Sequence, residues 1–321
     1  MKKATIVLLL AAVLLITVGV SLFIFPLATN GWDFSMLKGN RYQTKSYEIT
    51  EEFNKVTIDV VTSDVIIFPS TDGKVSVISN ERIKESNEVA VKDGTLSVKF
   101  NDTGTWYDKI SLFDSDEASI KIYLPIGELD ALNISVTTGD VFVSPALTFG
   151  TIDIDGTTGD VDGVANTTGR LRIHLTTGDV YMAGIRAGEI VIENTTGDIE
   201  LERIDCAGAM VINTGTGEIE LSDSAAASLT TEGTTGELEL MRVSLGGALT
   251  VNRASGDVSF RMLDAGSIDI DCTTGDVIGS VVKPMMFFAH TTTGDVRIPT
   301  PEAGGACRIE TTTGDIRVTI E

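Results

Sequence analysis

Short runs in which aliphatic and polar residues alternate recur along most of the chain. In one set, an aliphatic residue stands two positions after a recurring glycine: Val141, Val161, Val180, Ile199, Ile219, Leu238, Val258, Val277, Val296 and Ile316. A second set precedes each glycine, with apolar pairs such as Leu171/Ile173, Ile190/Ile192 and Ile268/Ile270. Alternation with a period of two predicts strands that bury one face.

The recurring glycine belongs to a four-residue motif, Thr-Thr-Gly-Asp, whose copies are 19 or 20 residues apart. Its glycines stand at 139, 159, 178, 197, 217, 236, 256, 275, 294 and 314, and the near-copies of the motif end at Glu218, Glu237 and Asp257. A second ladder of glycines lies half a repeat away, for example at Gly169 and Gly188. Glycine suits tight corners because it tolerates φ > 0. A period this regular predicts a solenoid of stacked units.

We therefore predict an all-β fold: a flattened, single-stranded β-solenoid with coils of 19–20 residues, each made of two strands and two turns. Coils would stack about 4.8 Å apart, and the general crossover rule favours a right-handed path. Residues 131–321 form the regular part, and residues 51–130 an irregular capping part of the same domain. There, Thr62-Ser63-Asp64-Val65 resembles a copy of the motif without its glycine.

The start of the chain is apolar. Ile6 to Phe25 contains twenty residues without a charge and follows Lys2 and Lys3. About 20 apolar residues are enough to span a bilayer, whereas the apolar core of a cleaved signal peptide, the alternative, has about 7–15. Residues 1–30 are therefore predicted to be a cytoplasmic stub and an uncleaved transmembrane signal-anchor, and 31–50 a tether. The N-terminal lysines favour a single-pass membrane protein with its N-terminus in the cytoplasm and residues 35–321 outside.

The run Ile120–Pro125, followed by Leu132–Val136 and then by the Thr/Ser-Gly-Asp-Val ladder, resembles the bacterial DUF4097 family. Members of this family are described as "putative adhesins", and some are anchored beside envelope-stress systems. The resemblance covers roughly residues 51–321. It implies a β-solenoid outside the membrane and carries over no catalytic residues.

Charge and cysteine content narrow the function further. The net charge of −22 argues against nucleic acid or anionic lipid as a partner.

The three cysteines are too far apart in the predicted solenoid to form disulfides. Cys206 and Cys272 should lie about three coils apart, and Cys272 and Cys307 about two, so we expect buried free thiols. No nucleophile elbow, zinc-binding histidine pair or phosphate loop occurs in the sequence. The chain is therefore predicted not to be an enzyme.

The acids that close the motif form a ladder. They should point outward along one edge, about 5 Å apart, where like charges repel by roughly 0.8 kcal/mol even in water. One explanation is that each carboxylate accepts backbone N–H groups within its own turn. The other is weak Ca²⁺ binding at Asp140, Asp160, Asp179, Asp198, Asp257, Asp276, Asp295 and Asp315. No other cofactor is expected.

Three features depart from the repeat. Arg253 occupies an inward position, so it either turns outward or pairs with a carboxylate such as Glu232. The apolar run 283–288 either fills the core or contacts a partner. The last strand, Ile316–Ile320, would leave the edge of the final coil open, which predicts weak self-association through that coil.

Together these features predict a membrane-anchored, extracytoplasmic binding or scaffold module of the cell envelope, with the N-terminal helix in the membrane and an envelope protein or polymer as partner. The alternative is an accessory protein of an envelope-stress signalling system. A third class, an enzyme acting on cell-wall glycan, is disfavoured because the acids recur in every coil, whereas a catalytic cluster is local.

Overall fold

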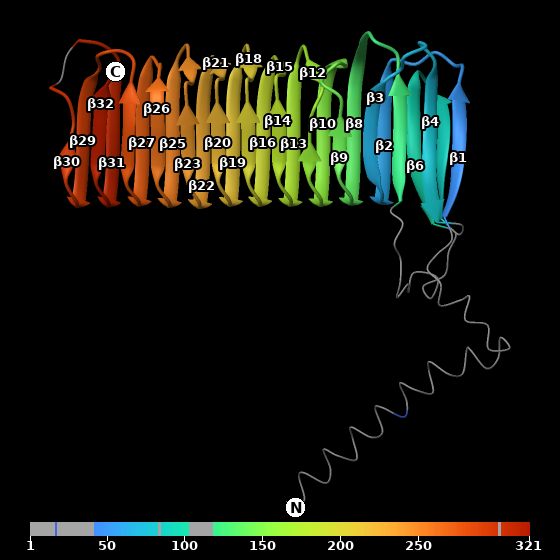
Figure 1. The fold of residues 1–321 in the computed structure, drawn as a ribbon, viewed down its shortest axis with the longest axis horizontal. Coiled ribbons are helices and arrows are strands. Elements are labelled where there is room, and N and C mark those ends of the chain that lie inside the picture. The colour runs from blue at the N-terminus through green and yellow to red at the C-terminus, as the bar shows by residue number, and fades with distance from the viewer. Residues whose placement is uncertain (1–16, 18–41, 83–84, 103–117, 301–302) are drawn as a thin grey trace, which may run out of the picture.

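The computed structural model describes residues 17, 42–82, 85–102, 118–300 and 303–321, and from Tyr42 onward these residues form strands and turns. Figure 1 shows the strands stacked side by side into a rod. The predicted all-β solenoid is confirmed. Apart from Thr17, the predicted signal-anchor lies outside the described residues, as does most of the predicted tether. Within the described part of the chain, no helix is long and apolar enough to span a bilayer.

Two long sheets face each other along the rod, and a small third sheet runs along one edge, at the top of Figure 1. Sheet 1 contains, in spatial order, β29 (Met286–Thr293), β31 (Ala306–Thr313), β27 (Ser267–Thr274), β25 (Ala248–Ser255), β22 (Ser228–Thr235), β19 (Ala209–Thr216), β16 (Glu189–Thr196), β13 (Arg170–Thr177), β10 (Thr148–Thr158), β8 (Glu128–Thr138), β2 (Lys55–Thr62), β6 (Thr95–Asp102) and β5 (Glu85–Lys92), with β12 (Asn166–Thr167) beside β10.

The strands of sheet 2 are shorter along the regular part of the rod. They are β1 (Tyr42–Ile49), β4 (Val75–Arg82), β7 (Ser119–Leu124), β3 (Asp64–Pro69), β9 (Val141–Val143), β11 (Val161–Asp162), β14 (Val180–Ala183), β17 (Ile199–Glu202), β20 (Ile219–Ser222), β23 (Leu238–Met241), β26 (Val258–Leu263), β28 (Val277–Val281), β32 (Ile316–Ile320) and β30 (Val296–Arg297). Sheet 3 consists of β15 (Arg186–Ala187), β18 (Asp205–Cys206), β21 (Ala225–Ala226) and β24 (Ser244–Leu245).

A typical coil runs from β16 through the motif turn into β17, then through a second turn into β18. The prediction of two strands per coil is therefore wrong for the middle of the rod, where sheet 3 supplies a third. At the second turn Arg203 has φ 55°, a conformation that glycine adopts more readily. The sequence has no glycine there, and the third strand is only two residues long, so alternation alone did not reveal it.

The core consists of columns of inward side chains in strict register. Ile190 pairs with Met210, Met210 with Leu229 and Leu229 with Leu249, and all four are at most 1% exposed. Parallel in-register strands repeat one environment from coil to coil, so each column stays apolar over the length of the rod. The predicted inward positions of both strand sets are confirmed along the middle of the rod.

The N-terminal end of the rod is closed by antiparallel strands. β1 pairs with β4, and β4 with β7, so part of the predicted tether is in fact the first strand of the fold. β2 and β3 stack directly on β8 and β9, while β6 and β7, which follow later in the chain, lie outside them. Strand order along the rod therefore differs from chain order at this end.

A matching exchange occurs at the C-terminal end. β31 and β32 lie between the β27–β28 coil and the β29–β30 coil. The last strand is thus paired on both sides, and the prediction that its edge is open is wrong; the open edge belongs to β29 and β30. The enclosed coil is the more deeply buried one: Ile309 and Ile316 are at most 1% exposed, whereas Val296 in the outer coil is 41% exposed.

Candidate functional site: the acidic edge

The motif turns stack so closely that only glycine fits their third position. Gly197 has φ 136°, and a Cβ there would lie 2.0 Å from the carbonyl oxygen of Gly178 in the preceding coil. Gly217, in the next coil, meets Gly197 in the same way. Glycine is therefore required both by the backbone conformation and by the stacking distance, which explains its recurrence in the motif.

The carboxylates of the motif form a hydrogen-bonded ladder that links coil to coil. The backbone N–H of Asp198 donates to Oδ1 of Asp179 at 2.8 Å, and that of Asp179 donates to Oδ1 of Asp160 at 2.7 Å. The same bond joins Asp140 to Asp64, Asp160 to Asp140, Glu218 to Asp198, Asp276 to Asp257, Asp315 to Asp276 and Asp295 to Asp315. The expectation of bonds within one turn is wrong, because each bond crosses to the neighbouring coil.

This arrangement offsets the repulsion between stacked acids. A hydrogen bond from an amide to a carboxylate is stronger than one between neutral groups. Asp64 accepts the first of these bonds, so the glycine-free turn at residues 62–65, which resembles the motif in sequence, also belongs to the ladder. Here Ser63 stands in the glycine position, and its carbonyl oxygen lies under Gly139.

The ladder is interrupted at Glu218 and Glu237, where the described structure shows no such bond to the next coil. Glutamate is one methylene longer than aspartate, so its carboxylate reaches beyond the neighbouring N–H. Burial raises the pKa of Glu218, and the charges of Glu237 and Asp198 raise it further. The folded protein therefore binds the proton of Glu218 more tightly than the unfolded chain does. The stability that this protonation contributes is present below the unfolded pKa and is lost as pH rises through the raised pKa.

On the inner side of the turn, inward side chains bind the motif glycines. Nδ2 of Asn194 donates to the carbonyl oxygen of Gly178 at 2.8 Å, and Oγ1 of Thr291 donates to that of Gly314 at 3.0 Å. Arg253, Cys272 and Thr311 make the equivalent bond to the motif glycine of the neighbouring coil, namely Gly236, Gly256 and Gly275. Outside the interruption at Glu218 and Glu237, the turns are thus stabilised from outside by a carboxylate and, in these coils, from inside by a polar core residue.

Asp179→Ala should lower the free energy of unfolding by about 1 kcal/mol, because the N–H of Asp198 loses its charged acceptor. Asp179→Asn keeps an oxygen acceptor and removes one charge between Asp160 and Asp198, so it should change stability by less than about 0.5 kcal/mol. Urea unfolding of the full-length variants measures both. Equal losses in the two variants would show that charge, and not the hydrogen bond, matters at this edge.

The ladder does not gather its acids into a compact metal site. Among the residues that the structure describes, no group of three or more His, Cys, Asp or Glu side chains could hold a metal ion. The aspartates proposed for Ca²⁺ are spread over successive coils, and Oδ1 of Asp140, Asp160, Asp179, Asp198, Asp257, Asp276 and Asp315 already accepts an N–H group. Weak Ca²⁺ binding stays a prediction, which calorimetric titration of the full-length chain checks.

All three cysteines are buried and free, as predicted. Burial raises the pKa of Cys307 to about 12, which makes its thiol unreactive at neutral pH. Because of the coil exchange, Cys272 and Cys307 lie in adjacent coils and not two coils apart. They occupy different columns, since Cys272 pairs in register with Thr311 and Cys307 with Ile268.

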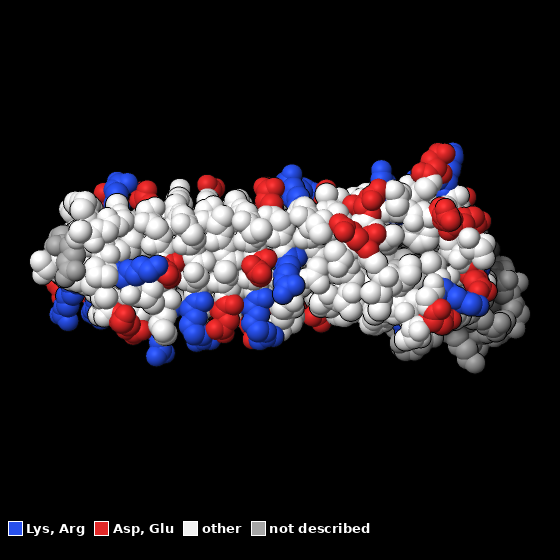
Figure 2. Space-filling view, turned by 90° about the horizontal axis from the view of Figure 1, so that it is seen from above, with Lys and Arg blue, Asp and Glu red and all other residues white. Residues whose placement is uncertain are grey.

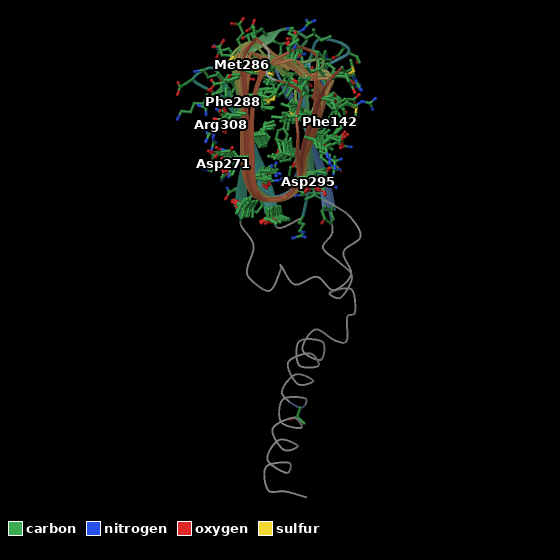
Figure 3. All side chains as sticks on the ribbon, turned by 90° about the vertical axis from the view of Figure 1, so that its left-hand side faces the viewer. Phe142, Asp271, Met286, Phe288, Asp295 and Arg308 are labelled. Atoms are coloured by element: carbon green, nitrogen blue, oxygen red, sulfur yellow. The ribbon has the colours of Figure 1, made fainter. Side chains whose placement is uncertain are left out.

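The apolar run at residues 283–288 is partly buried and partly exposed, so core filling is confirmed for some of its residues and a partner contact stays a prediction for the others. Met285 and Phe287 are each 3% exposed and fill the core, whereas Met286 and Phe288 are 41% and 55% exposed. Figure 3 views the rod from this end: Met286 and Phe288 lie toward the top, and Asp295 lies near the motif turn at the bottom. The exposed pair therefore belongs to the open end of the rod and not to the acidic edge.

An aromatic cluster on the outer face of sheet 2 was not predicted. Phe142 lies 5.5 Å from Phe68, and Phe68 lies 6.0 Å from Tyr123, measured between ring centroids. A Cβ on Gly163 would lie 2.9 Å from the Phe142 ring, so the ring extends over the next coil. The three aromatic residues occupy outward positions of β3, β7 and β9, and they could be grouped only once the coil exchange at this end was known.

Charges on the rest of the rod are mixed. Figure 2, which looks onto the edge that carries sheet 3, shows acidic and basic side chains interspersed along a mostly uncharged surface. Many are paired across coils, as Arg242 is with Asp223 and Lys283 with Asp264. Exposed pairs of this kind stabilise little, so this face offers no concentrated field of one sign.

A model of the family described as Toastrack DUF4097 matches residues 53–244 and 207–321 of the chain. No curated protein matches the sequence. Among solved structures, the chain is similar to a "putative adhesin" from Bacteroides fragilis NCTC 9343, with 18% identity and a TM-score of 0.42 over 87% of this chain and 97% of that one. It is also similar to a "putative adhesin" from Parabacteroides distasonis ATCC 8503, with 15% identity and a TM-score of 0.48 over 87% and 98%.

Proposed function

Because the chain belongs to the Toastrack DUF4097 family, we propose that it is a binding module that stands outside the cytoplasm and is tied to the membrane by its N-terminus. The observation that carries the proposal is the rod itself. Stacked coils repeat the same outward positions at a constant spacing, and solenoids use such extended surfaces to bind partners. The uncharged twenty-residue run at the start of the chain supports the membrane attachment.

The aromatic cluster of Phe68, Tyr123 and Phe142 is the surface that we assign to partner binding. Large aromatic side chains are enriched where proteins bind partners. The cluster lies near the N-terminal end of the rod, on strands β3, β7 and β9 of sheet 2. A partner in the envelope would therefore be held close to the proposed membrane anchor. The alternative function, an accessory of an envelope-stress system, differs only in the partner: a membrane sensor instead of an envelope polymer or structural protein.

Binding is tested by capture from solubilised envelope fractions with the full-length chain. Phe142→Ala should lose most of the captured partner. Ile278→Ala removes an apolar side chain that is 44% exposed on the outer face of the same sheet, and it should capture as much as the wild type. A partner that both variants retain equally would contradict the assigned surface.

Topology is tested separately, in spheroplasts of cells that express the full-length chain. Protease added outside should digest the rod or release it from the membrane, while a cytoplasmic marker protein stays intact. Complete protection of the rod, with digestion only after lysis, would place the fold in the cytoplasm and overturn the proposal.

A further inference from the structure

Arg253 is a buried cation inside the rod. It lies on β25 between Gly233 of β22 and Cys272 of β27, and it is 1% exposed. Its Nη1 donates to the carbonyl oxygen of Gly236 at 2.8 Å, while Nε and Nη2 have no hydrogen-bond partner. Both predictions for this residue are wrong, because it neither turns outward nor pairs with Glu232, which is exposed.

No carboxylate of the described residues balances this charge. In the same two coils, sheet 2 contributes Leu238, Leu240, Val258 and Phe260 to the core, and all are buried. Burial lowers the pKa of Arg253, but an arginine side chain stays protonated at neutral pH. A buried charge without a counter-charge is strongly unfavourable, so the core around Arg253 needs a negative partner.

A second observation concerns the polar atoms around this residue. Seven buried side-chain polar atoms in the described structure lack a partner, and five of them belong to Asn194, Thr214, Thr231 and Arg253. Asn194, Thr214, Gly233 and Arg253 occupy one column in four successive coils. The unsatisfied groups therefore gather in one stretch of the core.

Gly233 makes room at the centre of this stretch. A Cβ on Gly233 would lie 2.9 Å from Nη1 and 3.1 Å from Cζ of Arg253, so the guanidinium occupies the space that a side chain would fill. Thr231 lies two residues earlier on the same strand, on the same inward face, and is 0% exposed. Thr214 pairs with Gly233 from the preceding coil. The hydroxyl oxygens of both threonines lack partners.

We propose that this stretch of core binds a small monovalent anion, chloride, held by the Nε and Nη2 groups of Arg253 and by the hydroxyl of Thr231. The Nε–Nη2 edge is a fork of donors suited to anionic groups. A water molecule would accept these hydrogen bonds but would leave the charge uncompensated. Chloride supplies both the acceptor and the charge.

Thermal unfolding of the full-length chain tests this site when chloride is exchanged for gluconate at constant ionic strength. The melting temperature should rise by about 2–4 °C for each tenfold increase in chloride above the dissociation constant. Arg253→Met should abolish this dependence. Arg308→Met, which removes an exposed arginine from the same sheet, should retain it. A melting temperature of the wild type that does not change with chloride would overturn the proposal.

Thr231→Val keeps the shape of the side chain and removes only the hydroxyl, so it tests the site even if Arg253→Met does not fold. It should shift the chloride dependence to higher concentrations. Crystals grown with bromide in place of chloride should show an anomalous peak beside Nε and Nη2 of Arg253. Density at that position that fits a water molecule, without an anomalous peak from bromide, would refute the site.

Discussion

Ile199→Asp should lower the free energy of unfolding by several kcal/mol, because it buries a carboxylate without a partner between stacked coils. Ile199 is 1% exposed and lies in register between Val180 and Ile219. The neighbouring coils place aliphatic side chains on both sides of it, so the new charge would find no cation and no water.

Glu200→Lys is the matched control. Glu200 is the next residue, points outward and lies between Tyr181 and Glu220. The change should alter stability by less than about 0.5 kcal/mol, since the side chain is exposed. Urea unfolding of the full-length variants measures both effects. Similar losses in the two variants would mean that the strand register is shifted by one residue.

Gly197→Ala should be the second severe change, with a loss of about 3 kcal/mol or more. The new Cβ would lie 2.0 Å from the carbonyl oxygen of Gly178, and φ 136° is unfavourable for alanine. Coil stacking fixes the neighbouring backbone, so the clash cannot be relieved without opening the ladder between Asp179 and Asp198.

Gly246→Ala serves as the reference for a glycine that is not constrained. The nearest atom to a Cβ there is 3.8 Å away, and the residue does not have a left-handed φ. We expect a change of less than about 1 kcal/mol in either direction. Melting temperatures of Gly197→Ala and Gly246→Ala measure the two effects. A mild effect at Gly197 would show that the motif turns are less tightly stacked than the structure indicates.

Much of the fold could be predicted because one local pattern is repeated. Alternation placed Ile199 inside and Glu200 outside, and the constant spacing of the motif fixed which residues stack on which. The turn at residues 62–65 resembles the motif in sequence although it lacks glycine, since the flanking residues keep the pattern, but that Asp64 joins the ladder is shown only by the structure. These predictions rest on period-two geometry, which is local to each strand.

The order of coils at the two ends could not be predicted. A column of the core accepts any coil with apolar residues at the right positions, so the sequences of β29–β30 and β31–β32 fit the same place equally well by pattern. The two coils differ in side-chain size at both inward positions of this strand: Ile309 stands where the outer coil has Ala289, and Cys307 stands where the outer coil has Phe287. Burial of a larger side chain stabilises more, so the two differences oppose each other, and the alternation pattern does not weigh side-chain size.

The hydrogen-bond partner of each ladder carboxylate could not be predicted either. The motif shows that an acid follows each glycine, but whether its carboxylate bonds within its own turn or to the next depends on the stacking distance. The position of Arg253 inside the core, without a carboxylate partner, could not be predicted for a related reason. Its space exists only because Gly233 stands beside it in the adjacent coil, 20 residues earlier in the chain.

The exchange of the last two coils has a consequence for the order of synthesis. β29 and β30 leave the ribosome before β31 and β32, yet their final neighbours in the rod are β31 and β32. The outer coil can therefore take its final place only once the coil that follows it in the chain has been synthesised.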